Sequence, residues 1–141
     1  MPETTGLDLD VLQSTLNQVV APWVHDLGLR LLAARDGEVD LELPVSAPLV
    51  HSGGVLCGQA LMAAADTAMI LAIVTRLGSF KPMTTVQLQT SFLKPVAGHS
   101  SRCTVRARLL RLGRNLAFGE VLMHTDAGDL AAHATTTYAL L

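Results

Sequence analysis

One stretch of the chain, residues 55–74, constrains the fold more than any other because it is almost entirely apolar. Alanine, leucine and methionine dominate it, and Arg76 and Gly78 follow, as is typical of a helix ending. The stretch is nearly long enough to span a bilayer, but Gln59 and Asp66 lie inside it, and a charge at mid-span is costly in lipid. We therefore predict a long helix, apolar nearly all round, that is buried in a globular domain.

The segments around this stretch alternate apolar and polar residues as strands do. Residues 27–31 and 39–43 alternate on either side of Asp36-Gly37, which predicts a hairpin. Four further strands are expected after the helix, separated by turns rich in glycine and aspartate. Residues 83–93 and 101–110 alternate in the same way, and residues 115–124 and 130–140 are rich in β-branched and apolar residues.

An amphipathic helix is expected over residues 8–20, ending before Pro22, so the N-terminal segment 1–24 is predicted to be helical. No repeat, linker or low-complexity run divides the chain, and residues 1–141 are expected to form one domain. Helices that are not interleaved with strands favour an α+β domain with a mostly antiparallel sheet. A central apolar helix requires that sheet to curve around it.

The overall composition excludes several classes of protein. Of the 141 residues, 50% are hydrophobic and 16% are charged, which is too apolar for a disordered chain. The formal charge is −2 and aromatic residues make up 4%, so a nucleic-acid-binding surface is not expected. Two cysteines are too few for a disulfide scaffold, and no secretory leader is visible at the start. We expect a cytoplasmic protein that binds neither nucleic acid nor a membrane.

Asp66 most needs an explanation, because it lies among small apolar residues of the predicted helix. A buried carboxylate must be paired, protonated or functional. It could join a local hydrogen-bond network or a dimer seam, or it could be a general base or nucleophile in a partly desolvated cleft. Gln59 lies on the same helix face, two turns earlier. The small Ala63 between them, next to Met62, would leave room for a substrate group.

The glycine-bearing run from His51 to Gln59 leads into this helix. A helix start presents free N–H groups and the positive end of the dipole, which would stabilise an oxyanion, although a flexible loop could have the same sequence. The run matches neither a P-loop nor a dinucleotide fingerprint. No G-x-S-x-G elbow is present, Cys57 has no cationic neighbour, and no metal-ligand spacing occurs. We therefore expect neither a serine or cysteine nucleophile nor a metal.

Three segments, residues 53–68, 91–95 and 112–118, read GGVLCGQALMAAADTA, SFLKP and LGRNLAF. Together they resemble the hotdog-fold thioesterases of the PaaI-like (phenylacetic-acid degradation) group, over about residues 25–141. The resemblance implies a hotdog fold, in which a curved antiparallel sheet wraps a long helix, and self-association across sheet edges into a homodimer or homotetramer. It also implies hydrolysis of acyl-coenzyme A thioesters without a metal or a separate cofactor, since coenzyme A is part of the substrate.

The resemblance also implies roles for single residues. Asp66 matches the helix carboxylate that acts as base or nucleophile. Gly58 matches the helix-start amide that polarises the thioester carbonyl, with Gly54 as a competing placement. Thr84 or Thr85 falls near a strand hydroxyl, contributed by the partner subunit, that orients water. The basic residues implied to contact coenzyme A are Lys94, Arg111 and Arg114.

Other residues keep two interpretations. Gln59 would position the acyl group or water, or simply cap the loop. His51 is a binding candidate without a defined role, because the family's short motif has a histidine where Cys57 stands. The arginines of residues 101–110 would meet coenzyme A phosphates or form a solvated strand face. The residues considered for an apolar acyl tunnel, or for core packing, are Met62, Met69, Phe80 and Met83.

A medium-chain or aryl acyl group is the expected substrate. Two other functions stay open at this point. A non-catalytic sensor of acyl-coenzyme A would keep the pocket without needing a base. An acyl-thioester dehydratase would usually need a histidine paired with the carboxylate, and no convincing pair surrounds Asp66 in the sequence.

Overall fold

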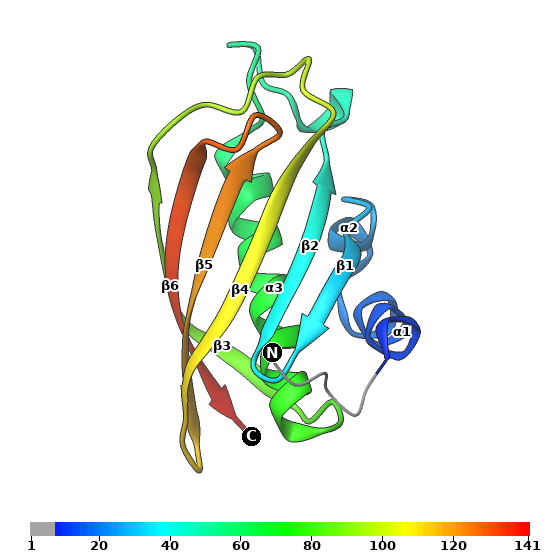
Figure 1. Ribbon diagram of the computed structural model, residues 1–141, viewed down its shortest axis with the longest axis vertical. Coiled ribbons are helices and arrows are strands. Elements are labelled where there is room, and N and C mark those ends of the chain that lie inside the picture. The colour runs from blue at the N-terminus through cyan, green and yellow to red at the C-terminus, as the bar shows by residue number, and fades with distance from the viewer. Residues whose placement is uncertain (1–7) are drawn as a thin grey trace.

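The computed structural model describes residues 8–141 as two short helices, two strands, one long helix and four strands (Figure 1). The helices are α1 (Leu9–Val19), α2 (Pro22–His25) and α3 (Gly58–Leu77), with a 3₁₀ turn at Ala47–Leu49. The strands are β1 (Arg30–Arg35), β2 (Glu38–Pro44), β3 (Met83–Phe92), β4 (Arg102–Leu112), β5 (Leu116–Thr125) and β6 (Leu130–Leu140). The predicted α+β order is confirmed. Of the segment 1–24 that was expected to be helical, residues 1–7 lie outside the described residues and α1 covers most of the rest. A second helix beginning at Pro22 and the 3₁₀ turn were not predicted.

All six strands form one antiparallel sheet in the order β1-β2-β4-β5-β6-β3, which curves around α3 (Figure 1). The two edges of this sheet differ. Gln13 of α1 accepts a hydrogen bond from the Leu31 N–H at 2.9 Å and donates one to the Leu29 carbonyl at 3.2 Å, which covers the start of β1. Strand β3 has a paired neighbour, β6, on one side only, so its outer edge is open within the described residues.

The central helix begins three residues later than the apolar stretch does. Val55 and Leu56 are extended instead, because Val55 bridges to Ala97 and the Leu56 N–H donates to the Val96 carbonyl at 2.8 Å. At the other end, Gly78 caps α3 in the left-handed conformation with φ 87°, as the Arg-Leu-Gly ending predicts.

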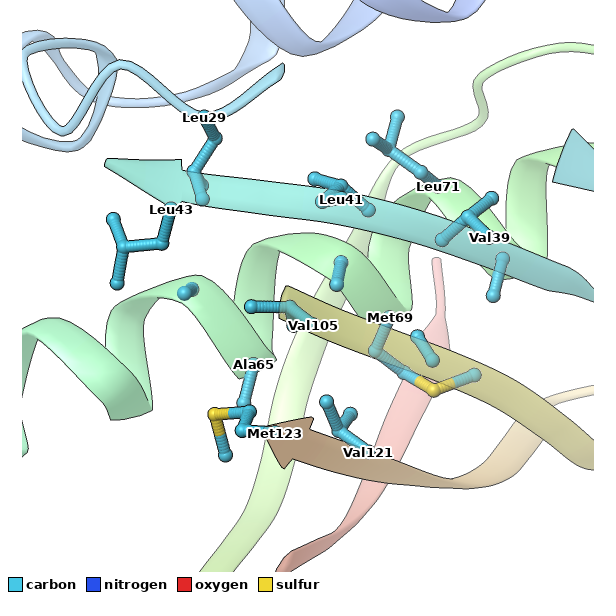
Figure 2. Close-up of a cluster of buried hydrophobic side chains, with 14 of the residues drawn as sticks. Leu29, Val39, Leu41, Leu43, Ala65, Met69, Leu71, Val105, Val121 and Met123 are labelled. Atoms are coloured by element: carbon cyan, nitrogen blue, oxygen red, sulfur yellow. The ribbon is translucent and has the colours of Figure 1, made fainter. Parts of the chain in front are cut away.

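Helix α3 is the centre of the hydrophobic core. By length and composition it could cross a membrane, but 67% of its most apolar window is buried inside the domain. Leu41 and Val105 from the sheet pack against it (Figure 2). Met69 of α3 fits over Gly119 of β5, where an added Cβ would lie 2.3 Å from Met69 Sδ. Any larger residue at position 119 would therefore overlap the Met69 side chain.

The alternation predicted for residues 83–93 is wrong in one respect. The β3–β6 register shifts between Thr85 and Gln87, so Val86 is an extra residue and is 59% exposed. Because of this bulge, Thr85 shares the half-buried face with Leu88, whereas Gln87 is exposed. Strict alternation had grouped Thr85 with Gln87.

Candidate active site

Asp66 is half-buried in the middle of α3 and is held by two hydroxyl groups from the sheet. Thr85 Oγ1 donates a hydrogen bond to Asp66 Oδ1 at 2.9 Å, and Tyr138 Oη donates to the same oxygen at 2.5 Å. The Tyr138 hydroxyl also lies 2.8 Å from the Asp66 carbonyl oxygen. The carboxylate therefore belongs to a hydrogen-bond network within one chain, and Thr85 reaches Asp66 of its own chain rather than a partner's.

The strand register explains why two hydroxyls meet there. Thr85 and Tyr138 are directly opposite each other in the β3–β6 ladder, and opposite side chains in an antiparallel pair lie on the same face. Burial raises the pKa of Tyr138 above its ordinary value, and the adjacent Asp66 charge raises it further. The phenol therefore stays protonated near neutral pH and acts as a donor. Sequence reasoning missed Tyr138, because nothing local links it to Asp66.

Asp66 also lines a cavity of about 320 Å³. The face of α3 predicted to carry Gln59, Met62 and Ala63 alongside Asp66 does line it. The other lining residues are Trp23, Val24, Thr67 and Leu88. Trp23 comes from the unpredicted helix α2, for which the proline at its first position was the available signal.

A second cavity, of about 400 Å³, lies at the start of α3 and includes Gly58. Cys57 provides no side-chain cap there, and the Gly58 N–H has no hydrogen-bond partner among residues 8–141. Gly54 differs, because its N–H donates to the His51 carbonyl at 2.9 Å and its φ of 81° serves a turn. Of the two glycines considered, Gly58 therefore has the available amide.

His51 borders the same cavity as Gly58. Its Nδ1 accepts the Gly53 N–H at 2.8 Å, so a neutral ring carries its proton on Nε2 and can donate from there. Lys94 borders this cavity too, but its ammonium pairs with Asp129 at 2.8 Å.

The predicted site residues do not form one site in a single chain. Gly58 and Asp66 stand two turns apart, about 12 Å along the helix axis, and their cavities share no lining residue. Arg111 and Arg114 lie at the β4–β5 turn, at the opposite end of the sheet from the start of α3, in a third cavity of about 320 Å³ (Figure 1). Thr84 is exposed on β3.

Other candidates have structural roles. Arg102, Arg106 and Arg108 of β4 form a charged outer face with carboxylates of neighbouring strands, such as Arg106 with Asp40 at 2.6 Å. Of the four residues considered for an acyl tunnel, Met62 alone lines the Asp66 cavity, and Met69 is core. Within residues 8–141, no cluster of three or more His, Cys, Asp or Glu side chains could hold a metal ion.

Comparison with known proteins identifies the class. Residues 53–132 match the thioesterase superfamily model, so the chain belongs to this superfamily, and its fold is the hotdog fold. Thioesterase HI1161 of Haemophilus influenzae is 25% identical with a TM-score of 0.84, over 100% of this chain and 95% of that one. A point mutant of the phenylacetic acid degradation protein PaaI from Thermus thermophilus is 29% identical with a TM-score of 0.76, over 86% and 100%.

A third solved structure is similar in fold at a lower sequence identity. The E. coli PaaI protein of the phenylacetic acid degradation operon superposes with a TM-score of 0.80 at 15% identity, over 92% of this chain and 89% of that one. At that identity the likeness shows the fold alone. The predicted resemblance to hotdog thioesterases is confirmed, and thioester hydrolysis is the activity that the superfamily supports in general terms.

Proposed function

We propose that this protein hydrolyses acyl-coenzyme A thioesters to a carboxylate and free coenzyme A. The observation that carries the proposal is the Asp66 carboxylate, which lines a cavity while two hydroxyls hold one of its oxygens. A general base or nucleophile needs such a positioned and partly desolvated carboxylate. The mainly apolar lining, with Trp23 and Met62, suits a medium-chain or aryl acyl group.

The proposed site needs two copies of the chain. One thioester carbonyl cannot contact the Gly58 amide and the Asp66 carboxylate of the same helix, which are about 12 Å apart. The open β3 edge offers a way to pair two copies, because α1 covers the other edge. We propose a homodimer, as such or within a homotetramer, in which antiparallel β3 edges bring the α3 start of one copy to Asp66 of the other.

In the proposed mechanism, the Gly58 N–H and the α3 dipole polarise the thioester carbonyl. Asp66 of the other copy takes a proton from water, whose oxygen attacks the carbonyl carbon. The C–S bond then breaks, and the coenzyme A thiolate takes up the proton. Direct attack by Asp66, which forms a mixed anhydride that water cleaves, is the other route. His51 Nε2, Gln59 and the exposed Thr84 are proposed to position the acyl group or water.

Coenzyme A is proposed to meet basic residues at the rim of the site. Because the β4–β5 turn and the α3 start lie at opposite ends of the sheet in one chain (Figure 1), the proposed antiparallel pairing would bring the turn of one copy towards the α3 start of the other. Arg111 and Arg114 form no ion pair among the described residues and so have free guanidinium groups for phosphate. Lys94, which pairs with Asp129 in the single chain, would release that carboxylate and bind a coenzyme A phosphate instead.

The free thiols Cys57 and Cys103 suit the reducing cytoplasm, where we propose that the enzyme acts.

Release of free thiol from a panel of acetyl-, hexanoyl-, palmitoyl-, benzoyl- and phenylacetyl-coenzyme A tests this proposal. Asp66→Asn should lower kcat by about 100-fold or more. The matched control is Asp10→Asn, which makes the same change on the exposed face of α1 and should leave kcat unaltered.

Near-normal turnover by a folded Asp66→Asn variant would overturn the assignment. Binding of acyl-coenzyme A without turnover of any panel member would replace it with the sensor function. Water addition to an enoyl thioester would indicate a dehydratase, but the hydrogen-bond partners of the Asp66 carboxylate are Thr85 and Tyr138, and no histidine is among them in the described residues.

A further inference from the structure

Tyr138 is unusual among the buried residues of this protein. It is 2% exposed and is the one aromatic side chain in a described core that otherwise consists of aliphatic residues, methionines and Cys103. Phenylalanine would fill the same space without a hydroxyl to satisfy. The single proton of the Tyr138 hydroxyl has two acceptors within reach, both on Asp66: Oδ1 at 2.5 Å and the carbonyl oxygen at 2.8 Å.

The two oxygens of the Asp66 carboxylate have different surroundings. Oδ1 accepts hydrogen bonds from Thr85 and Tyr138, whereas Oδ2 has no hydrogen-bond partner among residues 8–141. A short side chain fixed at one oxygen cannot rotate without losing both bonds. Tyr138 is the better anchored donor, because β6 is paired on both sides, while Thr85 precedes the bulge of edge strand β3.

The Asp66 carboxylate is held by hydrogen bonds rather than by an ion pair. Helix α3, strands β3 and β6 and helix α2 surround it, and no Lys, Arg or His of the described residues forms an ion pair with it. The nearest titratable group is Tyr138, whose pKa is raised by burial. A neutral donor keeps the full negative charge of the carboxylate available, which a paired arginine would offset.

We propose that Tyr138 is a positioning residue, whose hydroxyl holds Oδ1 of Asp66 and leaves Oδ2 as the oxygen that acts on water or on the acyl carbon. This inference rests on the proposed function of Asp66. It adds a residue far along the chain to the site, and it assigns separate tasks to the two carboxylate oxygens.

Tyr138→Phe tests the inference by removing one oxygen atom. The value of kcat should fall about 10- to 100-fold, because the carboxylate loses its fixed orientation, while KM changes little. The acid limb of the kcat profile should move to higher pH, because the ionised carboxylate loses a donor. The control is Thr136→Val on the same strand, which removes a buried hydroxyl that bonds the Gln87 carbonyl at 2.9 Å. It should leave kcat and its pH profile unchanged.

A second measurement needs no turnover. Tyr138 is the single tyrosine of the chain, so fluorotyrosine incorporation labels this position alone. Its fluorine resonance should move with pH as Asp66 gains a proton, and Asp66→Asn should abolish that movement. If the resonance moves with pH in Asp66→Asn as it does in the wild type, the inference is overturned.

The two proposals can fail separately. Loss of turnover in Asp66→Asn, together with an unchanged kcat and pH profile in Tyr138→Phe, would overturn the positioning role and retain the thioesterase. Full activity of Asp66→Asn would overturn the thioesterase mechanism, and with it the positioning role in catalysis.

Discussion

Replacing Gly119 by alanine should destabilise the fold, although the same change usually stabilises a strand. Alanine restricts the unfolded chain, which favours folding by about 0.4–1 kcal/mol where the site has room. Here the new Cβ would lie 2.3 Å from Met69 Sδ and 2.9 Å from the Arg108 carbonyl oxygen. Ordinary contact begins at 3.4 Å, so the sulfur must move by about 1.1 Å (3.4 − 2.3) inside a packed core. Overpacking of this kind costs about 1–3 kcal/mol.

Urea unfolding at one fixed protein concentration measures this effect, since a dimer's midpoint depends on concentration. Gly119→Ala should lower the midpoint without changing the slope. Met69→Ala alone should cost about 2–5 kcal/mol, and the double variant should cost less than the sum of the two, because the shortened side chain no longer meets the new methyl. Additive costs, or a stabilised Gly119→Ala variant, would refute the packing argument.

Two further predictions concern the site and the outer sheet face. Gly58→Pro should keep the fold, because proline suits the first helical position and the exposed Phe92 ring, 3.1 Å from an added Cβ, can shift into solvent. The change removes the amide and should lower kcat about 100- to 1000-fold. Mixing this variant with Asp66→Asn should restore about a quarter of the activity if each site combines two copies, and none if it does not. Hydrogen bonds from Arg108 and His133 lower the pKa of Glu120 from its ordinary value. Glu120→Gln should therefore lower the thermal midpoint near pH 7, and the difference from wild type should shrink as the pH falls through that lowered pKa.

Local patterns in the sequence predicted the elements whose periodicity is regular. Residues 39–43 and 101–110 alternate apolar and polar side chains, and burial alternates in the same way in β2 and along β4 as far as Leu109. The end of α3 was predicted from the adjacent residues Arg76, Leu77 and Gly78. The start of α3 was predicted too early, because Val55 and Leu56 are as apolar as the helix itself. Their extended conformation depends on residues 96–97, about forty positions later, which no local window contains.

The candidate site also depends on contacts that no local stretch of sequence contains. Asp66 stood out because a charge in an apolar helix is unusual, and the helical period placed Gln59 beside it. Thr85 and Tyr138 reach Asp66 only through the β3–β6 register. In a regular strand with Leu88 facing inward, alternation would turn Thr85 outward. The extra residue Val86 lets both face α3, so the hydroxyl on the carboxylate depends on one inserted residue whose effect appears only once the partner strand is known.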